Sequence, residues 1–376
     1  MALKKQFGPL GIIPLPGCEK LACQVNRYLT EWRRREPKAG CERDSFLVDV
    51  KVPRFKSGEA KGILPQTVRG LDLFIMVDVC NYSVTYDLCG QQNPMSPDDH
   101  YQNLKRVIAA CTGKPARINV IMPFLYESRQ HRRTVRESLD CANMLQELAA
   151  MGVTNILTFD AHDPRISNAI PLTGFDNFPT SYQFVKTLIN LNLHERFDKN
   201  EVLIISPDEG AVERAIYFAT ILGVNVSMFY KRRDYTQVIN GRNPIVAHEY
   251  LGEPVEGKTA IIVDDMIGSG DSMVDVARQL KARGARSVIA CASFGLFTSG
   301  LEVMDEACRE GLIDRVLTTN LIYQNPQLLE RDWYASVDMS EYLASVIDTM
   351  NHNSSLERLM TPSQKITTKL EETVKN

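Results

Sequence analysis

The 376-residue sequence lacks the features that mark a membrane, secreted or nucleic-acid-binding protein. It has no run of about 18 apolar residues, the length at which a helix can cross a bilayer. Its formal net charge is −3, so no overall basic surplus is present to attract nucleic acid or an anionic membrane. The N-terminal apolar stretch is interrupted by glycine and proline, unlike a signal peptide. We therefore expect a cytoplasmic protein that binds small molecules, without nucleic-acid or membrane partners.

The cysteines also lack an organised pattern. There are nine, an odd number, and none forms the CxxC pair that is typical of a zinc site. Scattered cysteines of this kind suit a reducing compartment. The sequence predicts neither a disulfide framework nor a structural zinc ion.

What the sequence does contain is a repeated alternation of short aliphatic runs and longer amphipathic segments. Aliphatic runs of five to nine residues are typical of strands buried on both faces of a parallel sheet, with helices covering those faces. The fold class is therefore α/β, with helices such as 138–151 and 273–284. The expected strands are 73–79, 118–124, 155–161, 202–208, 225–231, 259–265 and 287–294.

The length predicts two domains. Each half carries a strand, a helix and a strand that ends in an aspartate-containing turn. The segment around 160–175 is rich in proline, glycine and asparagine, so we place a boundary there. The expected division is an N-terminal domain at 1–165, a C-terminal domain at 166–340, and a polar C-terminal extension at 341–376.

The segment IIVDDMIGSGDSM (261–273) is the most informative stretch. Ligands of parallel sheets bind beyond the carboxyl ends of the strands, so Asp264 and Asp265 are expected to contact a sugar or a metal there. The small residues 268–272 precede a helix, whose N–H groups can surround a phosphate. For a GSGDS loop by itself, an ordinary turn with a capping serine or aspartate is the alternative interpretation.

This motif resembles the phosphoribosyl pyrophosphate motif of type I phosphoribosyltransferases and of ribose-phosphate pyrophosphokinases. The complete set of motifs, from about 54 to about 320, resembles the ribose-phosphate pyrophosphokinase family. The motifs that carry this resemblance, in addition to VDDMI, are RFKSGEAKGILPQTVRGLDLFIM (54–76), PFLYESRQHRR (123–133), NILTFDAHDPRI (155–166), SPDEGAVERA (206–215) and MFYKRRDY (228–235).

The resemblance implies two tandem phosphoribosyltransferase-like domains, each a mostly parallel sheet flanked by helices. It also implies Mg²⁺-dependent transfer of the pyrophosphoryl group of ATP to the 1-hydroxyl of ribose 5-phosphate, which gives phosphoribosyl pyrophosphate and AMP. The positions that match the family's motifs are Lys231 and Arg233 for catalysis; Phe55, Ser57, Glu59, Arg129 and Gln130 for ATP; Asp264, Asp265, Gly268, Ser269, Gly270, Asp271 and Ser272 for ribose 5-phosphate; and His162 and Asp208 for the metal.

The residue types suit this chemistry. Transfer of a phosphoryl-type group spreads negative charge over oxygen atoms, and fixed cations stabilise that charge. In an extended KRR segment, Lys231 and Arg233 point to one side, so both can face the phosphates. Taken singly, the basic segment can also be a solvated turn, and His162 an ordinary loop residue.

In the family, a neighbouring subunit supplies the residues that correspond to Phe55 and Glu59. The resemblance therefore implies a homo-oligomer built from dimers, such as a hexamer, with the ATP site shared between subunits.

Several segments depart from the family's usual pattern. Ser57 replaces the aspartate of FSDGE, Gly268 replaces the first aspartate of the phosphate loop, and His131 replaces the aspartate that usually follows Arg-Gln. The segment 79–100 is longer than its counterpart, and the first ~50 residues have no counterpart that the motifs reveal. Two other functions stay open at this point, a non-catalytic regulatory paralogue and a transferase that consumes phosphoribosyl pyrophosphate.

Overall fold

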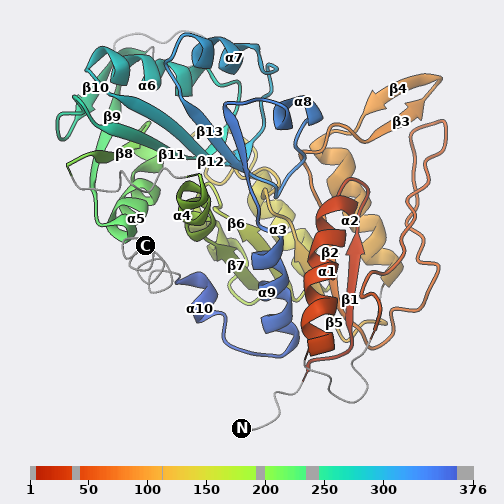
Figure 1. Cartoon of the computed structure of the whole chain (residues 1–376). Coiled ribbons are helices and arrows are strands. Elements are labelled where there is room, and N and C mark those ends of the chain that lie inside the picture. Colours follow the sequence, from red (N-terminus) through yellow and green to blue (C-terminus); the bar gives the residue numbers. More distant parts are fainter. Residues whose placement is uncertain (1–5, 36–42, 112, 192–199, 234–244, 362–376) are drawn as a thin grey trace. The chain divides into compact units, whose positions relative to one another are not determined.

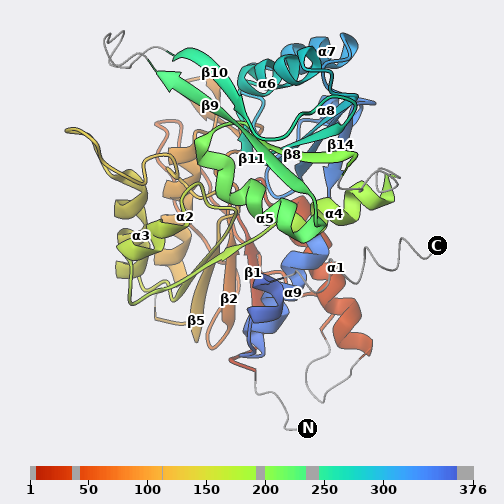
Figure 2. The same ribbon diagram turned by 90° about the vertical axis from the view of Figure 1, so that its left-hand side faces the viewer.

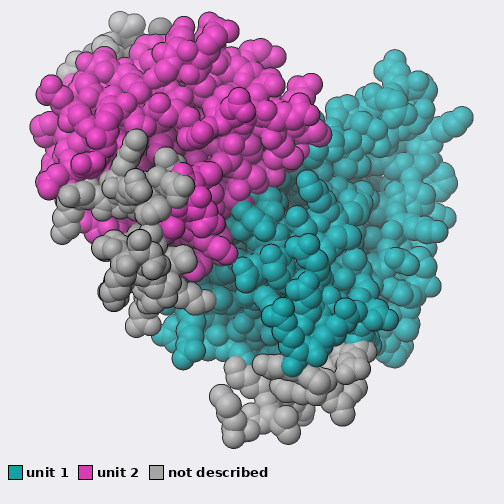
Figure 3. Space-filling model, viewed as in Figure 1, with its two compact units in different colours: residues 1–179, 320–323, 338–361 teal, residues 180–319, 324–337, 362–376 magenta. Residues whose placement is uncertain are grey.

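A computed structural model describes residues 6–35, 43–111, 113–191, 200–233 and 245–361, with only the backbone at 231–233 and 245–248. The chain forms two compact units (Figure 3). Unit 1 comprises 1–179, 320–323 and 338–361, and unit 2 comprises 180–319, 324–337 and 362–376. The expected α/β class is confirmed in both units.

Unit 1 is built around a five-stranded sheet of order β1-β2-β5-β6-β7, in which every neighbouring pair is parallel. Helices α1 and α9 cover one face of this sheet, and α2 and α3 cover the other (Figures 1 and 2). The strands are β1 (Leu10–Pro14), β2 (Asp72–Met76), β5 (Arg117–Ile121), β6 (Asn155–Phe159) and β7 (Gly174–Phe178); the helices are α1 (Glu19–Arg35), α2 (Pro97–Cys111), α3 (Asp140–Ala150), α9 (Ser340–Asn351), α10 (Glu357–Met360) and the 3₁₀ helix η1 (Pro164–Ala169).

The alternation of side chains along β2 divides the core of unit 1 into two layers. Leu73 and Ile75 belong to the cluster that packs under α2 and α3. Phe74 is also fully buried but does not belong to that cluster. On the face covered by α9, Phe159 and Phe178 meet the ring of Tyr342 at 6.1 and 6.3 Å. Both faces of the sheet are therefore apolar, which explains why its strands appear in the sequence as uninterrupted aliphatic runs.

Unit 2 is built around a seven-stranded sheet of order β10-β9-β8-β11-β12-β13-β14. Only β10 is antiparallel to its neighbour. Helices α6 and α7 lie on one face, and α4 and α5 on the other (Figure 2). The strands are β8 (Val202–Ser206), β9 (Asn225–Arg233), β10 (Ile245–Leu251), β11 (Thr259–Ile267), β12 (Ser287–Gly295), β13 (Arg315–Thr319) and β14 (Tyr334–Val337); the helices are α4 (Ser181–Asn190), the 3₁₀ helix η3 (Glu209–Ala211), α5 (Val212–Leu222), α6 (Asp271–Ala282), α7 (Glu302–Arg309) and α8 (Pro326–Leu329).

The structure divides the chain differently from the expected boundaries at 165/166 and 340/341. The segment around 160–175 contains η1 and leads into β7, which pairs with β6, so unit 1 extends to residue 179. β7 consists of GFDNF and is mostly half-buried at the edge of its sheet. Its glycine, aspartate and asparagine suggested a linker because these residues have low strand propensity; pairing with β6 decides otherwise.

The expected polar extension from residue 341 onwards instead begins with α9, which belongs to the core of unit 1. Leu343 and Ile347 of α9 are fully buried. The end of this helix is fixed by Asn351, whose Nδ2 donates to the buried Asp72 at 3.0 Å, and by an ion pair of 2.6 Å between Asp348 and Arg33 of α1. Residues 362–376 of the expected extension lie outside the described residues.

Two further findings concern membrane-spanning helices and the cysteines. Among the described residues, no helix combines the length and apolarity needed to span a membrane. The eight cysteines that the structure describes are free, and Cys41 lies outside that part of the chain.

Candidate functional site

In unit 2, the predicted acidic residues gather at the carboxyl ends of two adjacent parallel strands. Asp208 follows β8, and Asp264 and Asp265 lie on β11 beyond the last residue of β11 that pairs with β8, Ile262. Adjacent strands that end at the same edge bring these carboxylates to one side of the sheet. The sequence-based placement of these residues therefore matches the geometry within unit 2.

The Asp264 carboxylate is held in place by its own neighbours. Its Oδ1 accepts a hydrogen bond of 2.8 Å from the Asp265 backbone N–H, and Arg214 Nη1 of α5 lies 4.0 Å away. Burial, and then the negative charge of Asp265, raise the pKa of Asp264 to about 8, and Arg214 opposes the increase. Near neutral pH the pair therefore retains a proton and can both accept and donate hydrogen bonds to hydroxyl groups.

The loop between β11 and α6 contains a glycine with positive φ at a position where α7 packs closely against it. Gly270 has φ 99°, and a Cβ there would lie 3.0 Å from Met304 Sδ of α7. Ser269 Oγ donates to Asp271 Oδ2 at 2.6 Å, and Gly268 O accepts from the Thr298 N–H at 3.0 Å. Only glycine fits position 270 without strain. To contact a ligand, the Ser269 hydroxyl must exchange its bond to Asp271.

In unit 1, the predicted nucleotide and metal residues follow β5 and β6. Arg129 and His162 are exposed. His131 connects the two segments, because its ring lies 5.4 Å edge-on from His162 and its Nε2 lies 3.4 Å from Asp163. Asp163 also binds Arg165, whose hydrogen bonds are the main reason that the pKa of Asp163 falls to about 2. The tertiary structure therefore brings the 129–131 and 162–163 segments together.

The backbone of each of these two segments contains a non-glycine residue with a positive φ. Glu127 and Asp160 have positive φ values of 56° and 37°. Non-glycine residues adopt this conformation rarely, and such residues cluster at ligand sites. Asp160 directly follows β6 and Glu127 lies in the segment after β5, each two residues before His162 or Arg129.

The third predicted nucleotide element is the turn at 55–59. Phe55 is 56% exposed, and Ser57 and Glu59 are exposed as well. The turn is closed by the Phe55 N–H, which donates to Glu59 O at 2.8 Å, and Ser57 Oγ donates to Glu59 Oε2 at 3.0 Å. Its three predicted contact residues are thus presented to solvent on a defined backbone.

The predicted catalytic residues Lys231 and Arg233 lie at the end of β9. There the backbone pairs Lys231 with His248 and Arg233 with Ile245 of β10, with a register shift between Ile245 and Ala247. The expected extended backbone at KRR is therefore present. The side chains of both residues lie outside the described part of the structure.

For a metal, the predicted donors are His162 in unit 1 and Asp208 in unit 2. Among the described residues, no cluster of three or more histidine, cysteine, aspartate or glutamate side chains forms a ready metal site. A single carboxylate such as Asp208 does suit Mg²⁺, which keeps several waters and is bound by one or two carboxylates together with substrate phosphates.

Comparison with known proteins shows the relationship directly. A sequence profile of the N-terminal domain of ribose phosphate pyrophosphokinase matches residues 10–152, and one of the phosphoribosyl transferase domain matches residues 176–320. The chain is 30% identical over 272 residues to a ribose-phosphate pyrophosphokinase of Prochlorococcus marinus, covering 72% of this chain and 73% of the relative. The chain belongs to the ribose-phosphate pyrophosphokinase family.

Other relatives agree. A ribose-phosphate pyrophosphokinase of Thermosipho africanus is 32% identical over 257 residues, which is 68% of this chain and 73% of that protein. The crystal structure of phosphoribosylpyrophosphate synthetase from Mycobacterium smegmatis has the same fold, with a TM-score of 0.73 and 21% identity over 92% of this chain and 99% of that one. The expected pair of phosphoribosyltransferase-like domains is thereby confirmed.

The family match corrects one expectation. The first ~50 residues were expected to have no counterpart, but the N-terminal profile begins at residue 10. β1 and α1 belong to the sheet and helix layers of unit 1. The expectation was wrong because this region carries no site motif, and its packing role is visible only in the fold.

Two residues near the predicted sites were missed by sequence reasoning. Arg214 lies six positions after Asp208 and contacts Asp264 from α5. Arg54 precedes the 55–59 turn and binds Gly58 O at 2.9 Å and Asp99 at 3.0 Å. A charged residue at the start of a helix or beside a turn is common in any sequence, so neither residue carried a signal before the fold was known.

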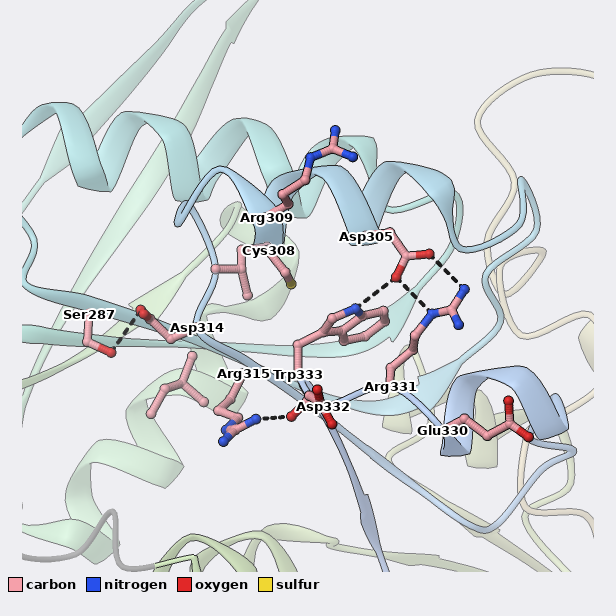
Figure 4. Close-up of a pocket in the computed structure, with 12 residues that line it drawn as sticks. Ser287, Asp305, Cys308, Arg309, Asp314, Arg315, Glu330, Arg331, Asp332 and Trp333 are labelled. Carbon is pink, nitrogen blue, oxygen red and sulfur yellow. Dashed lines mark hydrogen bonds and ion pairs between the residues drawn. The ribbon is translucent and has the colours of Figure 1, made fainter.

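A pocket of unit 2 lies at the opposite strand ends from the acidic pair (Figure 4). Its volume is about 710 Å³, and Ser287, Asp314 and Trp333, at or just before the first residues of β12, β13 and β14, contribute to its lining. Arg331 and Trp333 both donate to Asp305, and Ser287 donates to Asp314. Because its polar groups bind one another and its location is remote from β11's carboxyl end, we assign it no part in the family's reaction.

Proposed function

We propose that this chain transfers the pyrophosphoryl group of ATP to the 1-hydroxyl of ribose 5-phosphate. The products are phosphoribosyl pyrophosphate and AMP. The observation that carries the proposal is the carboxyl edge of unit 2, where Asp264, Asp265 and the 268–272 loop combine a diol-binding pair with a glycine-mediated helix start. The match to both family domains favours this reaction over that of a phosphoribosyltransferase.

The two ends of ribose 5-phosphate contact adjoining elements. Asp264 and Asp265 accept hydrogen bonds from the vicinal ribose hydroxyls, and the N–H groups of 268–272 bind the 5-phosphate at the start of α6. Ser269 and Ser272 add hydroxyl donors, and Gly270 allows the phosphate to approach the backbone. Asp271 belongs to the same loop, and its negative charge opposes phosphate binding. The N–H and hydroxyl donors must therefore outweigh this repulsion.

The nucleotide binds to segments of unit 1. Arg129 and Gln130 contact ATP, with the guanidinium stacked on adenine or paired with phosphate. Phe55, Ser57 and Glu59 contribute from a neighbouring subunit, so the active form is a homo-oligomer with shared ATP sites. Because the Ser57 hydroxyl can both donate and accept, base selectivity rests on the position of the turn as well as on its side chains.

In the reaction, the ribose 1-oxygen forms a bond to the β-phosphorus of ATP. The bond between that phosphorus and the bridging oxygen of AMP breaks, and the 1-hydroxyl loses its proton. Lys231 and Arg233 stabilise the charge on the transferring group. His162 and Asp208 are the residues that would associate with Mg²⁺, which would supply positive charge to the phosphates. The ionised form of Asp264, whose share increases as pH rises through its pKa of about 8, accepts the proton of the 1-hydroxyl.

The test is incubation of the purified protein with Mg-ATP and ribose 5-phosphate. AMP and phosphoribosyl pyrophosphate should appear in equal amounts, and label from the γ-position of ATP should appear in the sugar product. Omission of ribose 5-phosphate controls for ATP hydrolysis. No product would favour the regulatory paralogue, and free phosphate in place of labelled sugar would contradict pyrophosphoryl transfer. Light scattering tests the oligomer, and fractionation of cells tests the proposed cytoplasmic location.

A further inference from the structure

Two departures from the family's usual pattern contact each other inside unit 1. One is the 55–59 turn with its FKSGE sequence, and the other is the longer segment 79–100. The segment contains a two-stranded hairpin, β3 (Thr85–Leu88) and β4 (Gln91–Pro94), which projects from unit 1 (Figure 1). The N–H of Cys89 at the hairpin tip donates to Lys56 O at 3.0 Å.

The backbone conformation at the tip of the hairpin determines the contact between Cys89 and Lys56. Its connecting residues Cys89 and Gly90 have φ values of 52° and 83°. Positive φ at both central residues is typical of a type I′ turn, whose twist matches the paired strands. Cys89 adopts this conformation although it is not a glycine, and its backbone N–H is directed at the 55–59 turn.

The turn in return approaches the hairpin closely. Gly58 has φ 90°, and a Cβ at this position would lie 2.9 Å from Leu88 Cδ1. A larger residue would be strained at this φ and would require the Leu88 side chain to move. The contact between the two segments is therefore close on both sides.

Arg54 holds the turn, the hairpin and α2 together. Its Nη1 donates to Gly58 O at 2.9 Å, its Nη2 donates to Asp99 Oδ1 at 3.0 Å, and its guanidinium lies 4.0 Å above the ring of Tyr86. The Arg54 side chain is only 10% exposed. A planar guanidinium can make these three contacts at once, which an ammonium group cannot.

The anchor for Arg54 is itself rigid. Asp99 Oδ2 accepts from the Ser96 N–H at 3.0 Å, and the Asp99 N–H donates to Ser96 Oγ at 3.2 Å, a reciprocal capping box at the start of α2. Burial acts to raise the pKa of Asp99, but the Ser96 hydrogen bonds and the Arg54 charge outweigh it and lower that pKa. Asp99 thus stays ionised as the partner of Arg54.

We propose that Arg54 and the β3–β4 hairpin position the 55–59 turn for its nucleotide contacts. The inference rests on the proposed function, in which Phe55, Ser57 and Glu59 contact ATP. These three side chains are exposed, and the contacts that the structure gives them, the Ser57–Glu59 hydrogen bond and the Lys61 ammonium 6.0 Å from the Phe55 ring, come from the turn or from residues next to it, so their placement depends on the backbone of the turn. Arg54 is a positioning residue, and the hairpin sets ATP affinity and base preference without taking part in the transfer.

The test changes the contact between the 55–59 turn and the hairpin by one substitution on each side. Arg54→Lys keeps the charge opposite Asp99 but loses the fork that also reaches Gly58 O. Cys89→Pro removes the N–H and cannot adopt a φ of 52°. The matched control is Gln92→Ala, because Gln92 is exposed on the same hairpin. Initial rates with ATP, GTP and ribose 5-phosphate are measured for each protein, together with the thermal midpoint and oligomer size.

Both test variants should raise the KM for ATP ~10-fold, because each removes a hydrogen bond that holds the turn and thereby displaces its nucleotide-contacting side chains. Their preference for ATP over GTP should fall, while kcat and the KM for ribose 5-phosphate change less than ~2-fold. Gln92→Ala should behave as wild type. Unchanged KM for ATP in an active protein would overturn the inference alone, as would an equal rise of both KM values. A wild-type protein that makes no phosphoribosyl pyrophosphate would overturn the proposed function and this inference with it.

Discussion

At Lys231, the proposed function requires a cation that acts on the reacting phosphates and contributes little to the fold. The residue lies near the end of β9, paired with β10, which is an edge strand of the sheet. From the alternation of an extended segment, the sequence predicts Lys231 and Arg233 on one side of the strand and Arg232 on the other. The three adjacent cations should therefore differ in function despite similar chemistry.

Lys231→Ala should lower kcat by ~10²–10⁴, because a preorganised donor to transition-state charge is typically worth about 3–4 kcal/mol. The KM for ribose 5-phosphate should change much less, since the sugar contacts lie on β11 and the 268–272 loop. Initial-rate kinetics at saturating Mg-ATP measure both constants. Arg232→Ala is the matched control and should retain most of the turnover. Wild-type kcat in Lys231→Ala would show that this end of β9 is not catalytic.

Residue identity and strand position were enough to predict the acidic pair, but not its protonation. Two adjacent aspartates after TAIIV could be placed at a strand's carboxyl end from the sequence. The raised pKa of Asp264 depends on its burial and on the opposing charge of Arg214, which comes from α5. Charge state is a property of the surroundings, so the tertiary structure had to supply it.

At the scale of elements, the β11–α6 connection places a left-handed glycine where the phosphate is proposed to bind. Gly270→Val should raise the KM for ribose 5-phosphate at least ~10-fold and change the KM for ATP much less. A β-branched residue is strained at φ 99° and its Cβ meets Met304 Sδ at 3.0 Å. Displacement of the loop by that contact would misplace the N–H donors.

A control for this substitution must carry the same backbone strain elsewhere. Gly311 follows α7, has φ 70° and has no atom within 4 Å of an added Cβ. Gly311→Val should lose stability of about 1–3 kcal/mol from the positive φ, and retain both KM values. Equal effects of Gly270→Val on the two substrates, measured in the same assay, would contradict phosphate binding by this loop.

Elements that carry long apolar runs were predictable, and those defined by their partners were not. The predicted strand 202–208 corresponds to β8 (Val202–Ser206), and the predicted helix 273–284 to α6 (Asp271–Ala282). β7 was interpreted as linker because its residues have low strand propensity, and its pairing with β6 is a non-local interaction. α9 was assigned to a polar extension, although its apolar face packs in unit 1.

At the scale of the whole molecule, the chain crosses between its units several times, and Asp78 fixes one crossing. Residues 320–323 belong to unit 1, although in the sequence they stand between two segments of unit 2. Asp78, which follows β2, accepts from the Tyr323 N–H at 2.6 Å and from the Cys80 N–H at 2.9 Å. Burial raises the pKa of Asp78 to about 7, although these two hydrogen bonds oppose the increase.

The pH dependence of stability should report this carboxylate. An unfolded aspartate titrates near ~3.9, so folding favours the protonated form between that pH and about 7. The contribution is complete below the unfolded pKa and is lost as pH rises through the folded pKa. Denaturant unfolding should therefore show a free energy of unfolding that falls more between pH 5 and 8 in wild type than in Asp78→Asn. Asp44→Asn, at a fully exposed aspartate, should follow wild type. Parallel curves for Asp78→Asn and wild type would contradict the assignment.

The sequence by itself determined the α/β class, the strands β2, β5, β6, β8, β9, β11 and β12, and the strand ends at which Asp208, Asp264 and Asp265 lie, because these follow from local periodicity and chain order. The tertiary structure decided the extent of the units, the return of α9, the proton held by Asp264, and the contact of Arg54 with the β3–β4 hairpin. Each of these depends on residues brought together from distant positions: Asn351 with Asp72, Arg214 with Asp264, and Arg54 with Tyr86. Local propensity carries no information on such pairs, since their energies arise only when packing removes them from water.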